Sequence, residues 1–227
     1  PYLAAQLAVA LTYFFIYRLG RLMMDPMRAA AGTALIAASY YFTVPTIEFN
    51  HNVIQLPLWA GTIFIYARIR REPSLLMNWI LLGLICGIGF YAKYSFALLI
   101  GVLLIASLIE SSVRSTWTSR GPYSAMVITL IIFAPHLIWL VTHDFAPFFY
   151  LADRADSPTA SAPLWFLGAQ LADHLPIIAP LLFVGFASLK GAQASSADKQ
   201  DRRFLWLVTF APLFLTFLFA VITNSRI

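Results

Sequence analysis

The feature of this sequence that most restricts its fold is a series of long apolar runs joined by short polar connections. A helix that crosses about 30 Å of hydrocarbon needs about 20 mostly apolar residues. Of this chain 60% is hydrophobic and 11% is charged, whereas soluble domains average about 45–50% apolar and about 25% charged residues. We therefore expect an all-α, polytopic transmembrane helix bundle, and we exclude a cytosolic enzyme, a disulfide scaffold and a disordered tail. About eight spans are expected, at residues 1–17, 29–47, 52–67, 75–91, 94–110, 122–141, 165–188 and 204–222.

The longest apolar stretch, residues 75–110, is better explained by two helices than by one. A single helix of this length would extend about 54 Å at about 1.5 Å per residue, which exceeds the thickness of a bilayer. Its only interior charge, Lys93, lies near the midpoint. The sequence therefore predicts helices over 75–91 and 94–110 with a tight turn at Lys93.

The 15 lysines and arginines are distributed unequally between the two sides that eight spans define. Because cytoplasmic loops carry the excess of basic residues, the richer side is predicted to face the cytoplasm. The formal net charge of +5 thus reflects membrane topology, and no nucleic-acid partner is expected. The outer side holds Lys93, Arg154 and Arg226, and the cytoplasmic side holds Arg18, Arg21, Arg28, Arg68, Arg70, Arg71, Arg114, Arg120, Lys190, Lys199, Arg202 and Arg203.

The first polar cluster on the outer side lies where the second span ends and the third begins. It contains Glu48, Asn50, His51 and Asn52. On a helix, Glu48 and Asn52 would be i,i+4 neighbours whose side chains could meet on one face. A hydrated helix end would also explain these residues, but ionisable groups in a bundle favour a functional site.

The second cluster ends a glycine-rich run. Gly83 and Gly87 have a GxxxG spacing, which allows two helices to approach closely. Lys93 and Tyr94 follow at the outer turn. Lys93 could be a snorkelling anchor, but a cation on the side that the charge bias disfavours points to an ammonium that binds an anionic headgroup, such as a lipid phosphate.

The third cluster lies in or near the longest outer connection, residues 142–164. His143 beside Asp144 could be a metal ligand or a proton carrier, or simply a solvated loop residue. Arg154 adds a second outer cation that could meet phosphate. His136, inside the sixth span, is interpreted as a hydrogen-bonded core residue, and Cys86 as a small apolar one.

The order of three short segments on the outer side resembles a family of integral-membrane glycosyltransferases. The segments are FNHN and LPLW within residues 49–59, GFYAKY at 89–94, and PHLIW and HDF within 135–145. The family comprises bacterial relatives of the protein O-mannosyltransferases and of the lipid A aminoarabinose transferase, including rhizobial galacturonosyl transferases of lipopolysaccharide. The resemblance covers essentially the whole chain.

This resemblance implies a single membrane domain of the GT-C type over residues 1–227. Such enzymes move a sugar from a polyprenyl-phosphate donor to a lipid, glycan or protein acceptor at the periplasmic face of the bacterial inner membrane. Their catalytic carboxylate lies in the first outer loop. Because this chain opens with Pro1 and lacks that loop, we expect a piece of a longer protein, truncated at both ends and without its own general base.

The resemblance also implies roles for individual residues. Asn52 lies where many relatives place an aspartate and would hydrogen-bond donor or sugar hydroxyls. Lys93, with Arg154, would neutralise the phosphate of the leaving polyprenyl phosphate, and His143 would help to hold a divalent metal. The candidate donor- and substrate-binding residues are therefore Glu48, Asn50, His51, Asn52, Lys93, Tyr94, Asp144 and Arg154, with His143 as the candidate metal ligand.

Two other functional classes remain open. A transporter or flippase for a lipid-linked or small anionic substrate would place its coupling charges near the midplane, whereas the ionisable residues here lie at the outer ends of spans. A non-catalytic membrane scaffold would make the polar clusters a decoration of the membrane interface. An aspartate in the first outer loop of the longer protein would favour the enzyme, and an inverted repeat of helices would favour transport.

Overall fold

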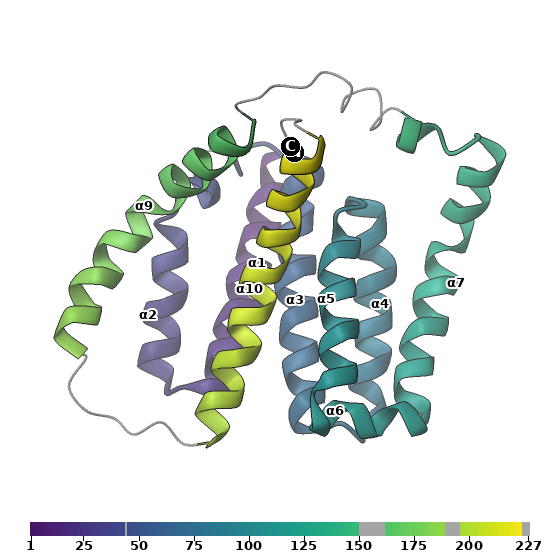
Figure 1. Cartoon of the computed structure of the whole chain (residues 1–227), viewed down its shortest axis with the longest axis horizontal. Helices are drawn as coiled ribbons and strands as arrows, with labels where there is room; N and C mark the ends of the chain where they lie inside the picture. Colours follow the sequence, from purple (N-terminus) through teal and green to yellow (C-terminus); the bar gives the residue numbers. More distant parts are fainter. Residues whose placement is uncertain (44, 150–161, 189–195, 224–227) are drawn as a thin grey trace. The chain divides into compact units, whose positions relative to one another are not determined.

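A computed structural model describes residues 1–43, 45–149, 162–188 and 196–223 of the chain. Within these residues the elements are all helices (Figure 1), which confirms the predicted all-α class. The chain divides into two compact units, one of residues Pro1–Thr33 and Pro45–Trp139 and the other of Ala34–Val44 and Leu140–Ile227. The expectation of one domain over 1–227 stays a prediction. The elements are α1 (Tyr2–Met23), α2 (Pro26–Ala37), η1 (Tyr40–Phe42), α3 (His51–Arg71), α4 (Leu76–Ala92), α5 (Phe96–Ile109), α6 (Ser111–Arg114), η2 (Ser115–Thr118), α7 (Arg120–Thr142), α9 (Ala162–Ser188) and α10 (Ser196–Thr223).

Helix α3 is the centre of the first unit, where α1 packs against one side of it and α4 against another. Small residues of α1 allow the first of these contacts, because Ala5 and Ala8 form a buried cluster with Val53 of α3. Farther along, the Phe15 ring of α1 lies against Gly61 of α3. The two helices can approach closely because alanine and glycine, at positions 5, 8 and 61, have little or no side chain.

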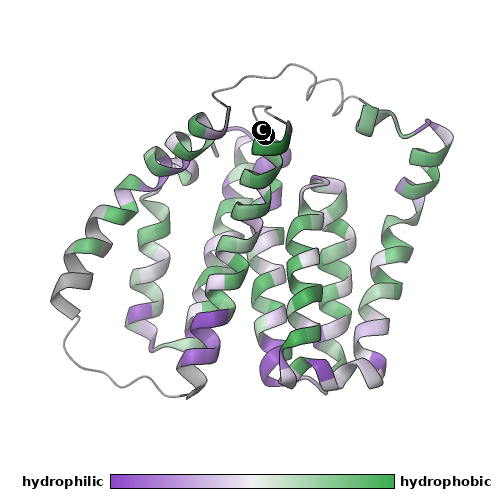
Figure 2. Ribbon diagram, viewed as in Figure 1, coloured by the Kyte–Doolittle hydropathy of each residue, from purple (hydrophilic) through white to green (hydrophobic). Residues whose placement is uncertain are grey.

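The two ends of the first unit differ in charge. At one end, a guanidinium nitrogen of Arg71 donates to the carbonyl of Leu22 at 2.9 Å, so the basic ends of α1 and α3 lie together. Beside them, the buried guanidinium of Arg70 forms an ion pair with the partly exposed carboxylate of Glu110 at 2.7 Å. Figure 2 shows hydrophilic colour at the ends of α3, α6 and α7 on this side. The arginines at the ends of α1 and α3, which the sequence assigned to the same side, therefore lie together at one end of this unit.

The predicted turn at Lys93 is confirmed. Helix α4 ends at Ala92, Lys93 has an extended backbone, and α5 begins at Phe96. Gly83 and Gly87 face α7: a Cβ on Gly83 would lie 2.6 Å from the carbonyl oxygen of Ala125, and one on Gly87 would lie 2.7 Å from Cβ of Ile132. The GxxxG spacing thus permits the close packing that the sequence suggested.

The expected helix over residues 29–47 is wrong in its second half. Helix α2 ends at Ala37, Ser39 adopts an extended backbone, and η1 follows as a short 3-10 helix. Pro45 cannot donate a backbone hydrogen bond to continue a helix, although the apolar character of the run extends past it. Hydropathy therefore marked a membrane-compatible segment, but it did not fix where the helix stops.

Among the described residues, three helices are long and apolar enough to cross a membrane, and a fourth span results if the bent pair Phe96–Ile109 and Ser111–Thr118 is counted as one. The three lie at Tyr2–Met23, Arg120–Thr142 and Lys199–Ile222. Helix α4 is apolar but shorter, and α3 ends in three arginines. Helix length and composition thus support three or four spans, fewer than the eight expected from apolar runs alone.

The second unit is built from η1, α9 and α10, together with the end of α7. Helices α9 and α10 contact each other, for example through the rings of Phe166 and Phe217, whose centres lie 6.2 Å apart. Helix α10 begins at Ser196, so the polar residues 196–203 are helical although the apolar run starts only at 204. Five of these eight residues are Ala, Lys, Gln or Arg, which have good helix propensity.

Candidate functional site

The amino end of α3 is fixed by an asparagine cap. Asn50 has an extended backbone, with φ −148° and ψ 178°, and its Oδ1 accepts hydrogen bonds from the N–H groups of Asn52 (2.9 Å) and Val53 (3.2 Å). Its Nδ2 donates to the carbonyl of Glu48 at 3.3 Å. Such caps satisfy backbone donors that the first helical turn leaves free. The side chain of Asn50, predicted to bind substrate, is thus engaged in starting the helix.

This cap corrects the expected arrangement of the first cluster. Because α3 begins at His51, Glu48 lies before the helix and does not share an i,i+4 face with Asn52. Glu48 and His51 are exposed, whereas Asn52 is half-buried. Among the four polar residues predicted there, Asn52 is the one whose side chain bonds to a residue of the second predicted cluster, Lys93.

The connection between α4 and α5, residues 93–95, is here called the Lys93 turn. Its three consecutive side chains bond to two different helices. Nζ of Lys93 donates to Oδ1 of Asn52 at 3.0 Å, and Nε2 of Gln55 donates to Oγ of Ser95 at 3.2 Å. Between them, the Tyr94 hydroxyl lies 2.7 Å from Nε2 of His136 on α7. The Lys93 turn is therefore hydrogen-bonded to α3 and to α7.

Among the residues that the structure describes, no carboxylate pairs with the cation of the Lys93 turn. Lys93 is exposed, and its ammonium donates to a neutral amide oxygen. Desolvation by nearby protein lowers the pKa of Lys93 from its ordinary value of 10.5. The Lys93 ammonium thus differs from the guanidinium of Arg70, which is paired with the Glu110 carboxylate.

His136 was interpreted from the sequence as a hydrogen-bonded core residue, and its bond to Tyr94 confirms the hydrogen bond. The sequence did not reveal that its partner adjoins Lys93. Its imidazole stacks on the Trp139 ring, with centres 5.4 Å apart and planes 15° apart, and it also contacts the Phe133 ring at 5.2 Å. Burial raises the pKa of Tyr94, so this phenol stays protonated at neutral pH and can donate to the imidazole.

The third cluster lies in the second unit or outside the described residues. His143 and Asp144 follow the end of α7, both exposed, and Nδ1 of His143 lies 3.1 Å from the Thr142 hydroxyl. Asp144 and Phe145 both have positive φ, 50° and 53°, and the Phe145 N–H closes the helix end on the carbonyl of Leu140 at 2.9 Å. Arg154 lies outside the described residues.

A metal site at His143 would need further ligands, because structural and catalytic metals take three or four protein donors. Throughout the ranges that the structure describes, no group of three or more His, Cys, Asp or Glu side chains could hold a metal ion. His143 and Asp144 supply two donors at most. The described residues therefore do not form a metal centre by themselves.

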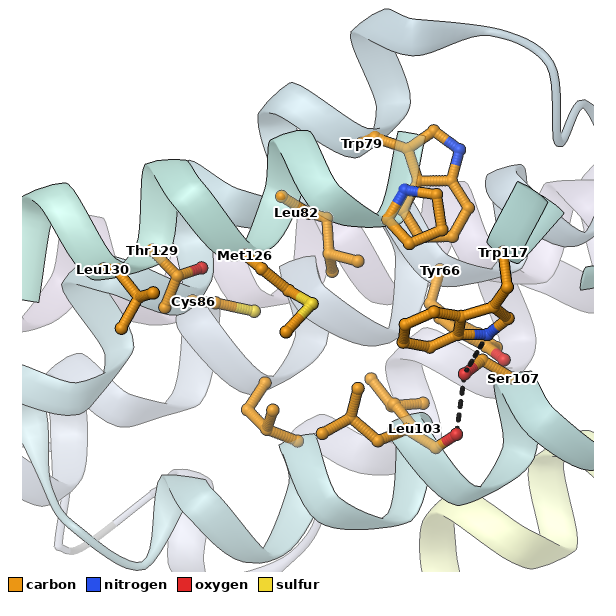
Figure 3. A pocket seen from close by; sticks show the side chains of 14 residues that line it. Tyr66, Trp79, Leu82, Cys86, Leu103, Ser107, Trp117, Met126, Thr129 and Leu130 are labelled. Carbon is orange, nitrogen blue, oxygen red and sulfur yellow. Dashed lines mark hydrogen bonds between the residues drawn. The ribbon is translucent and has the colours of Figure 1, made fainter. Parts of the chain in front are cut away.

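A separate pocket of about 220 Å³ lies between α4, α5 and α7 (Figure 3). It contains Tyr66, Cys86, Trp79 and Met126 among its lining residues, and the Trp117 indole at its edge donates to the Ser107 hydroxyl at 3.2 Å. The lining includes no lysine, arginine or histidine. The pocket can accommodate hydrocarbon but offers no cationic side chain to a phosphate.

Comparison with known proteins gives a consistent result. Residues 2–139 match the family described as dolichyl-phosphate-mannose-protein mannosyltransferase. The chain is 33% identical over 134 residues to the lipopolysaccharide core galacturonosyltransferase RgtA of Rhizobium johnstonii, an alignment that covers 57% of this chain and 26% of the relative. It is 31% identical to RgtB of the same organism over 163 residues, 68% of this chain and 31% of the relative.

A third relative extends the likeness over most of the chain. It is the undecaprenyl phosphate-alpha-4-amino-4-deoxy-L-arabinose arabinosyl transferase of Pectobacterium carotovorum, 27% identical over 231 residues, which covers 90% of this chain and 39% of the relative. The chain thus spans between 26% and 39% of the length of these relatives. No solved structure gives a significant match.

Proposed function

Because this chain belongs to the dolichyl-phosphate-mannose-protein mannosyltransferase family, we propose that the intact protein is a membrane glycosyltransferase. It moves a sugar from a polyprenyl-phosphate donor to a lipid, glycan or protein acceptor. Two kinds of relative support this, since they are named as a galacturonosyltransferase of lipopolysaccharide core and an arabinosyl transferase with an undecaprenyl phosphate-linked sugar. The apolar helices support a donor that is carried in the membrane.

The single observation that carries the proposed site is the pairing of Lys93 with Asn52. The amide oxygen orients the ammonium at 3.0 Å without removing its charge. A cation held in advance at the place where negative charge develops stabilises a transition state more than a cation that must first reorganise. The Lys93 ammonium is accordingly proposed to bind the phosphate of the donor.

The transfer step needs such a countercharge for a simple reason. The acceptor hydroxyl or amine attacks the anomeric carbon of the sugar, the bond from that carbon to the phosphate oxygen breaks, and the acceptor loses its proton to a base. Polyprenyl phosphate leaves as a monoester, which carries about one more negative charge at neutral pH than the diester did. The Lys93 ammonium would stabilise that added charge, with Arg154 as a second cation.

Other parts of the chemistry are assigned outside the Lys93 turn. Deprotonation of the acceptor is proposed to fall to a carboxylate in another part of the intact protein, as the family resemblance implies. No step is assigned to a metal, because the described residues do not assemble a ligand set. Glu48 and His51, both exposed at the start of α3, are proposed to contact the sugar or the acceptor.

The proposed topology places the Lys93 turn at the periplasmic face of the bacterial inner membrane, with the arginine-rich end of the first unit in the cytoplasm. The positive-inside rule supports this orientation. The eight apolar runs would then all cross the bilayer, including the shorter α4 and the interrupted segment of α2 and η1, once neighbouring helices complete the bundle.

The decisive experiment is sugar transfer by the purified intact protein in detergent. Donor and acceptor lipids are supplied together, and the covalent product is measured by mass spectrometry. A glycosyltransferase forms product in this system without a membrane barrier, whereas a transporter or flippase forms none. Lipopolysaccharide and glycan profiles of a deletion strain, with and without the restored gene, then identify the acceptor.

A further inference from the structure

The backbone of the Lys93 turn is weakly tied to α4. The Lys93 N–H reaches the carbonyl of Gly89 at 3.4 Å, which is longer than the usual range of about 2.7–3.2 Å for such bonds. The next bond, from the Phe96 N–H to the carbonyl of Lys93, is 3.0 Å long and belongs to the start of α5. The carbonyls of Tyr94 and Ser95 likewise accept from the first turn of α5, at 2.9 and 3.0 Å. The backbone of the turn is therefore fixed to α5 more firmly than to α4, and side-chain bonds connect it to the other helices.

Those side-chain bonds come from two directions. Asn52 and Gln55, one turn apart on α3, hold Lys93 and Ser95. Tyr94, which lies between these two residues, bonds to His136 on α7. The bond of Tyr94 therefore ties the turn to α7, in addition to the two bonds that tie it to α3.

His136 is well suited to be the fixed partner of Tyr94. Its ring stacks on Trp139 and contacts Phe133 on its own helix, and the Tyr91 ring of α4 lies 5.5 Å away. The Tyr91 hydroxyl in turn donates to the carbonyl of Ile132 on α7 at 2.9 Å. The imidazole is thus held between rings on a helix that packs closely against α4.

We propose that His136 is a positioning residue for sugar transfer, which acts by holding the Tyr94 hydroxyl and thereby fixing the Lys93 ammonium where the donor phosphate binds. The inference rests on the proposed role of Lys93 and adds a residue that does not touch the donor. Its physical basis is geometric, since a displacement of a catalytic contact by about 1 Å can lower a rate about 100-fold.

The test uses the intact protein, four variants of the Tyr94–His136 pair, one control variant and Lys93→Met. His136→Phe keeps an aromatic ring but removes the acceptor, and Tyr94→Phe removes the hydroxyl alone. The double variant reports whether the two changes act through the same bond. His136→Gln restores an amide group near the position of Nε2, so it should recover most of the lost activity.

Tyr123→Phe is the matched control. The Tyr123 hydroxyl donates to the carbonyl of Trp117 at 2.9 Å, so this variant also removes a tyrosine hydrogen bond of α7, but at the opposite end of the helix. The measurements are kcat/KM for the polyprenyl-phosphate sugar, Kd for undecaprenyl phosphate, and the melting temperature. A purely structural role would lower the melting temperature but would leave both constants of the folded protein unchanged.

The expected result is a loss of about tenfold in kcat/KM for His136→Phe, for Tyr94→Phe and for the double variant alike, with a weaker Kd and with rescue by His136→Gln. Tyr123→Phe should retain the activity of the parent protein. Should His136→Phe fail to fold, Tyr94→Phe and His136→Gln still decide the question, because both are smaller changes.

Two outcomes separate this inference from the proposed function. In the first outcome, Lys93→Met abolishes transfer, but Tyr94→Phe and His136→Phe either match the parent protein or have effects that add in the double variant. His136 is then not a positioning residue, and the role of Lys93 stands. If Lys93→Met is itself fully active, the proposed function of the Lys93 turn is lost, and the inference with it.

Discussion

The Lys93 ammonium donates to the Asn52 amide oxygen at 3.0 Å across 41 residues of sequence. The same helix α3 that supplies Asn52 carries Arg70 near its other end, where the guanidinium is neutralised by Glu110 at 2.7 Å. One end of the first unit therefore holds a paired cation that stabilises the packing of α3 on α5. The other end holds a cation whose partner leaves its charge uncompensated.

The first prediction concerns the charge of Lys93. Lys93→Ala should lower kcat/KM for sugar transfer from a polyprenyl-phosphate donor by at least about tenfold, about 1.4 kcal/mol of transition-state stabilisation, because the leaving phosphate loses its countercharge. The initial rate of product formation measures this effect. Arg114→Ala, which removes a cation from the arginine-rich end of the same unit, is the control, and equal activity of both variants would reject the phosphate role.

The second prediction concerns the coupling of Lys93 to Asn52. Asn52→Ala should lower kcat/KM about three- to tenfold, equivalent to about 0.6–1.4 kcal/mol, because the charge-assisted hydrogen bond that orients the ammonium is lost. In the double variant with Lys93→Ala, the loss should be no greater than for Lys93→Ala alone. Losses that multiply instead would show that Asn52 acts independently of the ammonium.

The third prediction concerns pH. Desolvation lowers the pKa of Lys93 below its ordinary 10.5, so the ammonium loses its proton, and its charge, at a lower pH than an ordinary lysine does. The alkaline limb of kcat/KM, which reports groups of the free enzyme, should therefore fall with an apparent pKa below 10.5.

Lys93→Arg serves as the comparison for this profile, because a guanidinium stays protonated throughout the accessible range. Whatever the absolute rate of that variant, its alkaline limb should shift to higher pH. An identical limb in both proteins would mean that a group other than Lys93 controls it.

The fourth prediction concerns the packing of α4 against α7. Gly83→Ala should lower the free energy of unfolding by about 1–3 kcal/mol, because the new Cβ would lie 2.6 Å from the backbone oxygen of Ala125, which cannot rotate away. The melting temperature in detergent measures this. Gly101→Ala is the control, since no atom lies within 4 Å of its added Cβ, and it should be neutral or slightly stabilising. Equal melting temperatures for the two variants would contradict the close contact.

Hydropathy and spacing predicted much of the fold correctly. The tight turn at Lys93 followed from the length of the apolar stretch, and the close approach at Gly83 and Gly87 followed from their spacing. The end of α2 was not predicted, because it depends on a local backbone choice at Ser39 rather than on the average character of a window. The start of α3 at His51 lies one residue from the predicted start of the third span, but the i,i+4 pairing of Glu48 with Asn52 failed because the Asn50 cap leaves Glu48 outside the helix.

The sequence by itself determined that this chain forms apolar helices and that their arginines gather at one side, because hydrophobicity and charge are properties of each residue that sum along a segment. Only the tertiary structure decided which polar side chains meet. Lys93 with Asn52 and Tyr94 with His136 are separated by 41 and 42 residues. Their contact depends on how α3, α4 and α7 pack, which a pattern along one helix does not encode.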